Sequence, residues 1–235
     1  MNMKPRVICH MVASLDGKVT GAYLARPEAA VATDVYYEIN RDLAPDAFAC
    51  GRVTMEGSFT GGYYPDLSAF EGCDEPYLDH VADAGAGFFA VAFDRQGRLG
   101  WQTPRIVDED PGYGGAHIIE VLTEQAPAAY LSYLKSIGVS YIFGGEVDLD
   151  LSYVLKKLHR LFGIETLLLE GGSVINGAFQ RADMIDEISL VIAPTVADAA
   201  DLPLFANSTL SDFALAKTKV YDGGVLWLNY RRKEI

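Results

Sequence analysis

The chain has 235 residues, of which 50% are hydrophobic and 22% charged, a composition typical of globular proteins. Aspartate and glutamate (32) outnumber lysine and arginine (19), so the formal net charge is −13 at pH 7. A chain this acidic lacks the basic face that nucleic acids require, and an anionic membrane surface would repel it. A small anionic ligand is not excluded, because it needs only a local positive site.

The sequence does not indicate membrane insertion, secretion or structural metal binding. Its longest apolar run, residues 88–93, has the length of a strand, whereas a membrane span needs roughly 20 residues. The N-terminal segment is interrupted by Cys9, His10 and Asp16, which predicts a first strand and not a secretory signal. The three cysteines and four histidines show no metal-ligand or disulfide spacing. We therefore expect a cytoplasmic protein without a metal.

The first half of the chain contains short apolar runs separated by turn signals. We expect strands at residues 7–13, 46–50 and 87–93, and a helix from Thr33 through Leu43 with Thr33 as its N-cap. Residues 58–77 are rich in Gly, Tyr and Pro and predict a loop. Residues 94–101 predict a turn and a short hairpin, and the acidic residues 101–115 predict a solvated loop.

The second half alternates helices and strands more clearly. We expect helices at residues 126–136, 150–162 and 173–181, with Asp150 capping the second and Gly163 ending it. Strands are expected at residues 139–143, 164–169 and 187–192, and a hairpin at 213–232 around Asp222-Gly223-Gly224. This alternation predicts one α/β domain over residues 1–235, with a mainly parallel sheet, helices on both faces and a C-terminal antiparallel hairpin.

The sharpest local signal is the run Leu167-Leu168-Leu169-Glu170-Gly171-Gly172-Ser173, in which a buried strand leads through two glycines into a helix. Glycines let the backbone approach a ligand closely, and the following helix offers free N–H groups to an anion. A tight strand–helix turn without a ligand would use the same glycines. Glu170 favours a site, because a carboxylate at the carboxyl end of a buried strand lies where open α/β sheets bind ligands.

Two further turns have the same arrangement. In Cys50-Gly51-Arg52-Val53-Thr54, Arg52 suits a phosphate through its planar fork, although a surface arginine paired to a nearby carboxylate would look the same. Thr54 is compatible with a helix N-cap. In Ser14-Leu15-Asp16-Gly17-Lys18, Asp16 could orient a substrate and Lys18 could meet a phosphate; the alternative is an Asp-Gly turn with solvated charges. His10, alone inside a strand, is expected to be a satisfied core residue.

These motifs, followed by residues 178–187 (Ala-Phe-Gln-Arg-Ala-Asp-Met-Ile-Asp-Glu) and Ile192-Ala193-Pro194, resemble the reductase domain of riboflavin-biosynthesis deaminase-reductases and their stand-alone relatives. The resemblance spans about residues 6–232 and is thin between about 60 and 135. It implies the dihydrofolate-reductase-like fold, NADPH as cofactor, and hydride transfer that reduces the ribose of a ribosylamino-pyrimidine 5′-phosphate to a ribityl chain. The deaminase motifs are missing, which indicates a stand-alone reductase.

Carried over by position, the resemblance implies roles for individual residues. Gly171, Gly172 and Ser173 would hold the pyrophosphate of NADPH. Gly51, Arg52 and Thr54 would line the cofactor, with Arg52 near the adenosine 2′-phosphate, and Ala13 would lie near the nicotinamide. Asp16, Lys18 and Glu170 would face the substrate, and Asp66 partly matches a substrate-binding segment of the family. Asp16 and Glu170 are the candidate catalytic residues, because a carboxylate near a ring-opened sugar imine can stabilise positive charge or supply a proton. A homodimer is also implied, and the C-terminal strands or residues 202–205 could form its interface.

The chain departs from the family pattern where the substrate phosphate is normally bound. The usual Asp-x-Pro-x-Leu-Thr-x-Arg segment reads Tyr63-Tyr64-Pro65-Asp66-Leu67-Ser68-Ala69-Phe70, without the arginine, and the usual glycine after Pro194 is also absent. Reduction of a different pterin-like or carbonyl compound is therefore an alternative. A non-catalytic nucleotide-binding module is another, although it would need neither Asp16 nor Glu170.

Overall fold

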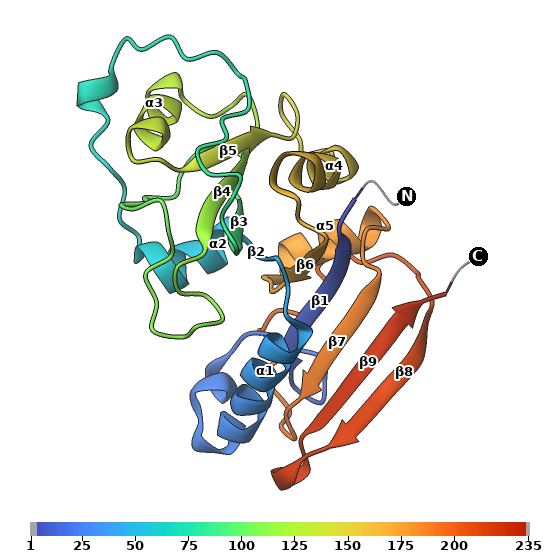
Figure 1. The fold of residues 1–235 in the computed structure, drawn as a ribbon. Helices are drawn as coiled ribbons and strands as arrows, with labels where there is room; N and C mark the ends of the chain where they lie inside the picture. The colour runs from blue at the N-terminus through green and yellow to red at the C-terminus, as the bar shows by residue number, and fades with distance from the viewer. Residues whose placement is uncertain (1–3, 234–235) are drawn as a thin grey trace. The chain divides into compact units, whose positions relative to one another are not determined.

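The structure is a computed structural model that describes residues 4–233. The chain divides into two compact units, one formed by residues 4–5 and 46–167 and the other by residues 6–45 and 168–233. Figure 1 shows the path of the chain and labels its helices and strands. Within the described residues no helix is long and apolar enough to cross a membrane. The same part of the chain holds no cluster of three or more His, Cys, Asp or Glu side chains suited to a metal ion.

The first unit contains four parallel strands in the order β5-β4-β3-β2. They are β2 (Ala47–Gly51), β3 (Phe89–Phe93), β4 (His117–Leu122) and β5 (Ser140–Phe143). Helices α3 (Ala128–Ser136) and α4 (Leu151–Phe162) both pack against β5, and Figure 1 shows them on either side of it. A short helix α2 (Arg52–Met55) follows β2 and continues as one π-helical turn, η3 (Glu56–Thr60); a 3₁₀ turn, η4, spans Ser68–Phe70. The carboxyl ends of β2 to β5 therefore lie along one edge of this unit.

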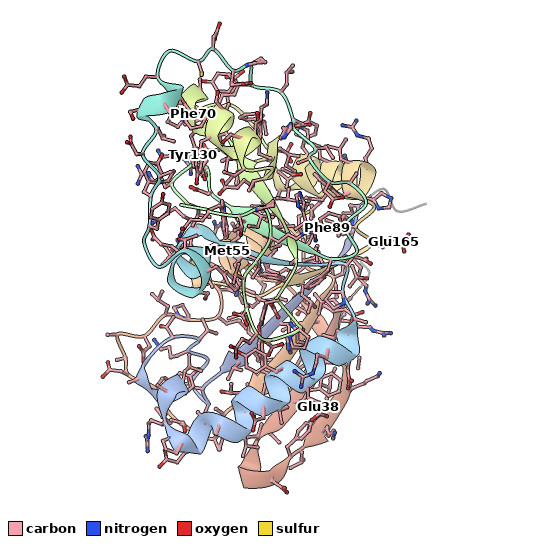
Figure 2. All side chains as sticks on the ribbon, turned by 60° about the vertical axis from the view of Figure 1, so that its left-hand side comes forward. Glu38, Met55, Phe70, Phe89, Tyr130 and Glu165 are labelled. Carbon is pink, nitrogen blue, oxygen red and sulfur yellow. The ribbon has the colours of Figure 1, made fainter. Side chains whose placement is uncertain are left out.

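The core of the first unit is mainly apolar but contains buried polar groups, among them the carboxyl group of Glu120. Met55, Phe89 and Tyr130, labelled in Figure 2, are buried in it. The Glu120 side chain from the middle of β4 is also fully buried, and its Oε1 accepts hydrogen bonds from Trp101 Nε1 and from the Tyr130 hydroxyl (2.9 Å). Among the described residues its Oε2 has no hydrogen-bond partner. Burial raises the pKa of Glu120 well above its usual value and thus favours the neutral acid over the carboxylate.

The second unit contains strands in the order β6-β1-β7-β9-β8. They are β1 (Arg6–Ala13), β6 (Thr166–Leu169, where the chain passes from the first unit to the second), β7 (Glu187–Ile192), β8 (Phe213–Val220) and β9 (Leu226–Arg232). β1 and β7 are parallel, whereas β9 is antiparallel to both β7 and β8. Helix α1 (Ala30–Leu43) packs on β1 and β7, where Val35 and Ile39 meet Val191. The remaining helices are α5 (Ser173–Arg181) and the 3₁₀ turns η1 (Ala22–Ala25), η2 (Pro27–Ala29) and η5 (Asp222–Gly224).

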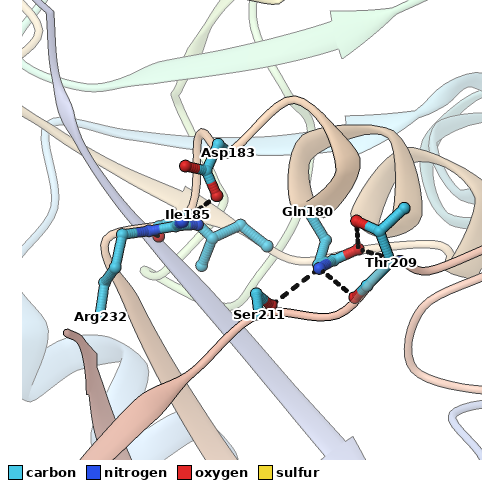
Figure 3. Close-up of polar contacts among 6 residues, drawn as sticks. All are labelled: Gln180, Asp183, Ile185, Thr209, Ser211 and Arg232. Atoms are coloured by element: carbon cyan, nitrogen blue, oxygen red, sulfur yellow. Dashed lines mark hydrogen bonds and ion pairs between the residues drawn. The ribbon is translucent and has the colours of Figure 1, made fainter. Parts of the chain in front are cut away.

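An irregular segment, residues 195–211, bonds to two elements of the second unit, the turn after β1 and helix α5; we call this segment the strap. Its first half bonds to the turn after β1, through Leu15 N to the Thr195 carbonyl (2.8 Å) and Val19 N to the Leu202 carbonyl (2.9 Å). Its second half bonds to α5, where the buried Gln180 side chain donates to the Thr209 carbonyl and to Ser211 Oγ, both at 2.8 Å (Figure 3).

The far end of α5 is tied to the last strand. Arg232 donates from Nε to the Ile185 carbonyl (2.7 Å) and forms an ion pair with Asp183, as Figure 3 also shows. Together with the bonds of Gln180 to the strap, this contact fixes the C-terminal end of α5.

Most sequence predictions for the elements are confirmed. The helices at 173–181 and 150–162 and the strand at 187–192 occur as expected, with Asp150 accepting a hydrogen bond from Tyr153 N (3.0 Å) and Gly163 ending its helix at φ 69°. The predicted C-terminal hairpin is also present, with η5 as its turn. The expected mainly parallel α/β sheet is confirmed.

Two predictions for the elements are wrong, and one strand is not predicted. Helix α1 begins at Ala30 with Ala29 as N-cap, and Thr33 lies inside it, donating from Oγ1 back to the Ala29 carbonyl (3.3 Å). The sequence pattern predicts no element at residues 117–122, where the structure has strand β4 with the buried Glu120 at its centre. No strand follows the turn at residues 94–97, so the hairpin expected at 94–101 does not form; Leu99 and Trp101 are buried as irregular chain.

Candidate functional site

Glu170 stands at the carboxyl end of β6 in the second unit. Its side chain is only 7% exposed. Oε1 accepts two hydrogen bonds from α1, one from the Tyr36 hydroxyl (2.8 Å) and one from Asn40 Nδ2 (2.6 Å). A carboxylate with two donors on one oxygen is held in a single orientation, which a group that must face a substrate requires.

The two glycines after Glu170 form the turn into α5. Gly171 has φ 107°, a conformation that a residue with a Cβ rarely adopts, and a Cβ there would lie 3.1 Å from the Met11 side chain. Gly172 is the N-cap residue of α5. This turn therefore requires glycine for two reasons, conformation and space.

Ser173, the first residue of α5, is 1% exposed, and its Oγ has no hydrogen-bond partner within the described residues. A buried hydroxyl without a partner costs free energy. It lies beside the unpaired N–H groups of a nine-residue helix, where an anion is favoured. The donor set of this turn fits the phosphate groups of a dinucleotide.

Asp16 lies in the turn after β1 and is exposed. Its Oδ1 accepts hydrogen bonds from Ser14 Oγ (2.6 Å) and from Ala197 N of the strap (3.0 Å). These bonds, with a smaller effect of the Lys18 charge, lower the pKa of Asp16, so it is a carboxylate at neutral pH.

Lys18 lies in the same turn, but its ammonium group is already bonded. It donates to the carbonyls of Ala199 (3.1 Å) and Asp201 (2.7 Å) in the strap. Ala13, which precedes this turn, is fully buried at the carboxyl end of β1. The second unit by itself thus contains both candidate carboxylates and the glycine turn.

The remaining candidate residues belong to the first unit. Gly51 ends β2 and is the N-cap residue of α2, so Thr54 lies inside the helix and is not its cap. Arg52 Nη1 donates to Glu56 Oε2 at 2.6 Å, one helical turn on. This is the carboxylate pairing that the alternative interpretation of Arg52 predicts. Asp66 is exposed, and its Oδ1 accepts a hydrogen bond from Ser68 N (2.9 Å), which lowers its pKa.

Sequence reasoning missed Tyr36 and Asn40, the residues that hold Glu170. Asn40 is 2% exposed and lies next to Ile39 on the buried face of α1, so its place in the helical period was the available signal. The prediction for His10 is confirmed: it is fully buried and both ring nitrogens have partners, Ser189 Oγ (2.9 Å) and the Tyr36 carbonyl (3.0 Å).

A mainly parallel α/β sheet with a carboxylate and a glycine turn at the carboxyl end of one strand defines a class of small-molecule and nucleotide-binding domains. Residues 93–227 match the family described as RibD C-terminal domain. The chain belongs to this family, and the resemblance stated from the motifs is confirmed.

Two relatives carry the same name. The chain is 35% identical over 88 residues to the 2,5-diamino-6-ribosylamino-4(3H)-pyrimidinone 5′-phosphate reductase of Aquifex aeolicus, a match that covers 37% of this chain and 39% of that protein. It is 28% identical over 204 residues to the protein of the same name from Methanothermobacter thermautotrophicus, covering 85% and 82% of the two chains.

A solved structure shares the fold. The pyrimidine reductase-like protein of Corynebacterium diphtheriae superimposes with a TM-score of 0.69 at 15% identity, covering 98% of this chain and 93% of that one. At this level of identity the similarity concerns the fold alone.

Proposed function

We propose that this chain is an NADPH-dependent reductase that acts on a ribosylamino-pyrimidine 5′-phosphate of riboflavin biosynthesis and converts its ribosyl group to a ribityl chain. The names of the two relatives support the reaction. The observation that carries the proposal is the arrangement after β6, where a fixed Glu170 carboxylate is followed by a glycine turn and the buried, unpartnered Ser173 hydroxyl.

In this proposal Gly171, Gly172 and Ser173 hold the pyrophosphate of NADPH, and Ala13 lies near the nicotinamide. NADPH supplies the hydride. The protein's own contribution is to hold the acceptor carbon close and to exclude water, so no activated nucleophile is needed. Gly51, Arg52 and Thr54 are further proposed cofactor-binding residues.

Asp16 and Glu170 act on the substrate. A ring-opened sugar imine develops positive charge at nitrogen before reduction, and a fixed carboxylate stabilises that charge. Because its hydrogen bonds lower the pKa of Asp16, this residue contributes charge and does not donate a proton at neutral pH. Lys18 and Asp66 are the proposed substrate contacts.

The first test is a titration of the purified protein with NADPH and NADH, followed by oxidation of NADPH at 340 nm with the ribosylamino-pyrimidine phosphate. Turnover in the wild type that falls at least a hundredfold in Glu170→Gln, with NADPH binding retained, supports the proposal. Binding without turnover would leave a nucleotide-binding module or a different substrate. Binding of neither nucleotide would refute the reductase assignment.

NADPH preference is proposed to depend on Arg52. Arg52→Ala should weaken NADPH binding about tenfold or more and leave NADH binding nearly unchanged, because only NADPH carries the 2′-phosphate. Glu56→Gln should act in the opposite direction, since it frees the guanidinium from its carboxylate at 2.6 Å. Equal losses for both nucleotides in Arg52→Ala would contradict this role.

One observation favours the second candidate, reduction of an unphosphorylated pterin-like or carbonyl compound. From Val53 to Asp94 the sequence contains no lysine or arginine but eight carboxyl residues. Lys18, the other candidate for a substrate phosphate, donates to two carbonyls. Comparing kcat/KM for the phosphorylated substrate and its dephosphorylated form separates the two candidate functions. A lower kcat/KM for the phosphorylated substrate supports reduction of an unphosphorylated compound.

We further propose that the chain is a cytoplasmic homodimer with one reductase domain and a small-molecule substrate. Apolar side chains continue across β7, β9 and β8 on one face: Val220 pairs with Leu226 and Leu226 with Ile192. Val220 is 71% exposed, so a second copy on this face would bury apolar surface. Light scattering on wild type and Val220→Glu tests the dimer.

A further inference from the structure

We infer that Tyr36 and Asn40 are positioning residues, which fix one oxygen of the Glu170 carboxylate so that the side chain keeps a single orientation toward the substrate. This inference rests on the proposed role of Glu170. It concerns only the second unit, which contains every residue involved.

The geometry joins α1 to the end of β6. The Tyr36 hydroxyl donates to Glu170 Oε1 at 2.8 Å, and Asn40 Nδ2 donates to the same oxygen at 2.6 Å. The two residues are four apart in α1 and therefore lie on one face of the helix. Glu170 and Asn40 are both buried, so water does not compete freely for these bonds.

Tyr36 is itself held by a chain of hydrogen bonds that begins in β9. Trp227 Nε1 donates to Ser189 Oγ (2.9 Å), and Ser189 Oγ lies 2.9 Å from His10 Nδ1. His10 Nε2 lies 3.0 Å from the Tyr36 carbonyl, which can only accept. Nδ1 lies closer to Ser189 Oγ, which can donate, than to the Ser189 carbonyl at 3.3 Å. We therefore place the proton of His10 on Nε2, with the Ser189 hydroxyl donating to Nδ1.

The His10 ring also stacks on the Tyr36 ring, with centroids 4.3 Å apart and planes 3° from parallel. Burial lowers the pKa of His10 from 6.5 to about 4, so the imidazole is neutral at physiological pH and keeps this tautomer. The phenol of Tyr36 thus has a fixed backbone, a fixed ring plane and one acceptor, Glu170 Oε1.

Hydrogen bonds to a charged form favour that form. Tyr36 and Asn40 therefore favour the Glu170 carboxylate over the acid. The Cys9 thiol of β1 also lies within the electrostatic reach of Glu170, and burial raises the pKa of Cys9, so this thiol is neutral at neutral pH.

The first experiment needs no substrate. The Glu170 side-chain carboxyl is followed by NMR against pH in protein labelled at glutamate Cδ, with Glu170→Gln to assign the signal. Tyr36→Phe, which removes one oxygen and keeps the ring on His10, should raise the midpoint by about one pH unit, and Asn40→Leu should raise it similarly. Tyr153→Phe, at a helix position 48% exposed, is the matched control and should change nothing. An unchanged midpoint in Tyr36→Phe and Asn40→Leu would overturn the inference.

The second experiment measures kcat in a double-mutant cycle. If Tyr36 acts through Glu170, Tyr36→Phe lowers kcat about tenfold in the wild type, leaves the Kd for NADPH unchanged, and has no further effect in Glu170→Gln. Equal effects in both backgrounds would overturn the positioning role. If the wild type shows no turnover but the Glu170 midpoint is raised in Tyr36→Phe and Asn40→Leu, the proposed function is refuted. The hydrogen bonds of Tyr36 and Asn40 to the Glu170 carboxylate would still be supported.

Discussion

Buried His10 should make the protein lose stability in acid within a defined pH range. In the folded protein burial lowers the pKa of His10 from 6.5 to about 4, whereas the unfolded chain titrates near 6.5. Between these values the unfolded chain binds a proton that the folded protein does not, so stability rises with pH. Above pH 6.5 the imidazole of His10 is neutral in both states and does not reduce the free energy of unfolding. As the pH falls from 6.5 toward 4, protonation of the unfolded chain lowers that free energy progressively. A pKa difference of this size corresponds to about 3 kcal/mol, at about 1.4 kcal/mol for each pH unit.

The assay is urea unfolding of wild type and His10→Gln at several pH values between 7 and 4. Glutamine can still donate to the Tyr36 carbonyl but does not titrate, and all other titrating groups are common to both proteins. The free energy of unfolding of the wild type should fall relative to the variant by about 3 kcal/mol between pH 6.5 and pH 4. Two curves that remain parallel across this range would refute the assignment of a neutral, buried imidazole.

Three further predictions concern stability. Gly177→Ala should destabilise the protein by about 1–3 kcal/mol despite the higher helix propensity of alanine, because the new Cβ would lie 1.9 Å from the Ala206 carbonyl oxygen. The control in thermal unfolding is Gly57→Ala, where a Cβ meets nothing within 4 Å. Glu120→Gln should become more stable than the wild type as the pH rises above 4.5, by up to about 1.4 kcal/mol for each pH unit. The reason is that the unfolded wild type releases a proton that the buried Glu120 retains, whereas glutamine does not titrate. A difference independent of pH in urea titrations would argue against a raised pKa of Glu120. Lys157→Met should cost about 3 kcal/mol or more in chemical unfolding, because it removes the buried ammonium group 2.8 Å from Asp79 Oδ1 and leaves this carboxylate with the Phe143 amide as donor. A loss below about 1 kcal/mol would show that Asp79 is solvated.

The parts of the fold that sequence reasoning predicted are those set by neighbouring residues. The helix at residues 173–181 follows from two glycines before an apolar period, and the helix ending at Gly163 follows from its caps. Strand β4 could not be predicted, because the buried Glu120 resembles an exposed charge until Trp101 and Tyr130 are known to bond it.

The candidate site shows the same division. Glu170 and the glycines could be identified because they are consecutive. The residues that hold Glu170 could not, since Tyr36 and Asn40 are 134 and 130 positions away in the chain. The first turn of α1 was missed because Thr33 bonds backward to Ala29 and does not cap the helix.

The strap has a consequence for anyone who wishes to exchange parts of this protein. Several of its backbone amides and carbonyls bond to the turn at residues 14–20 or to helix α5, so the conformation of the strap depends on both of these elements. Grafting the turn alone would leave the Leu202 carbonyl and the Leu204 amide without their partners, Val19 N and the Gly17 carbonyl. The turn, the strap and α5 should therefore be transplanted as one cassette, and natural variants of this family should exchange them together.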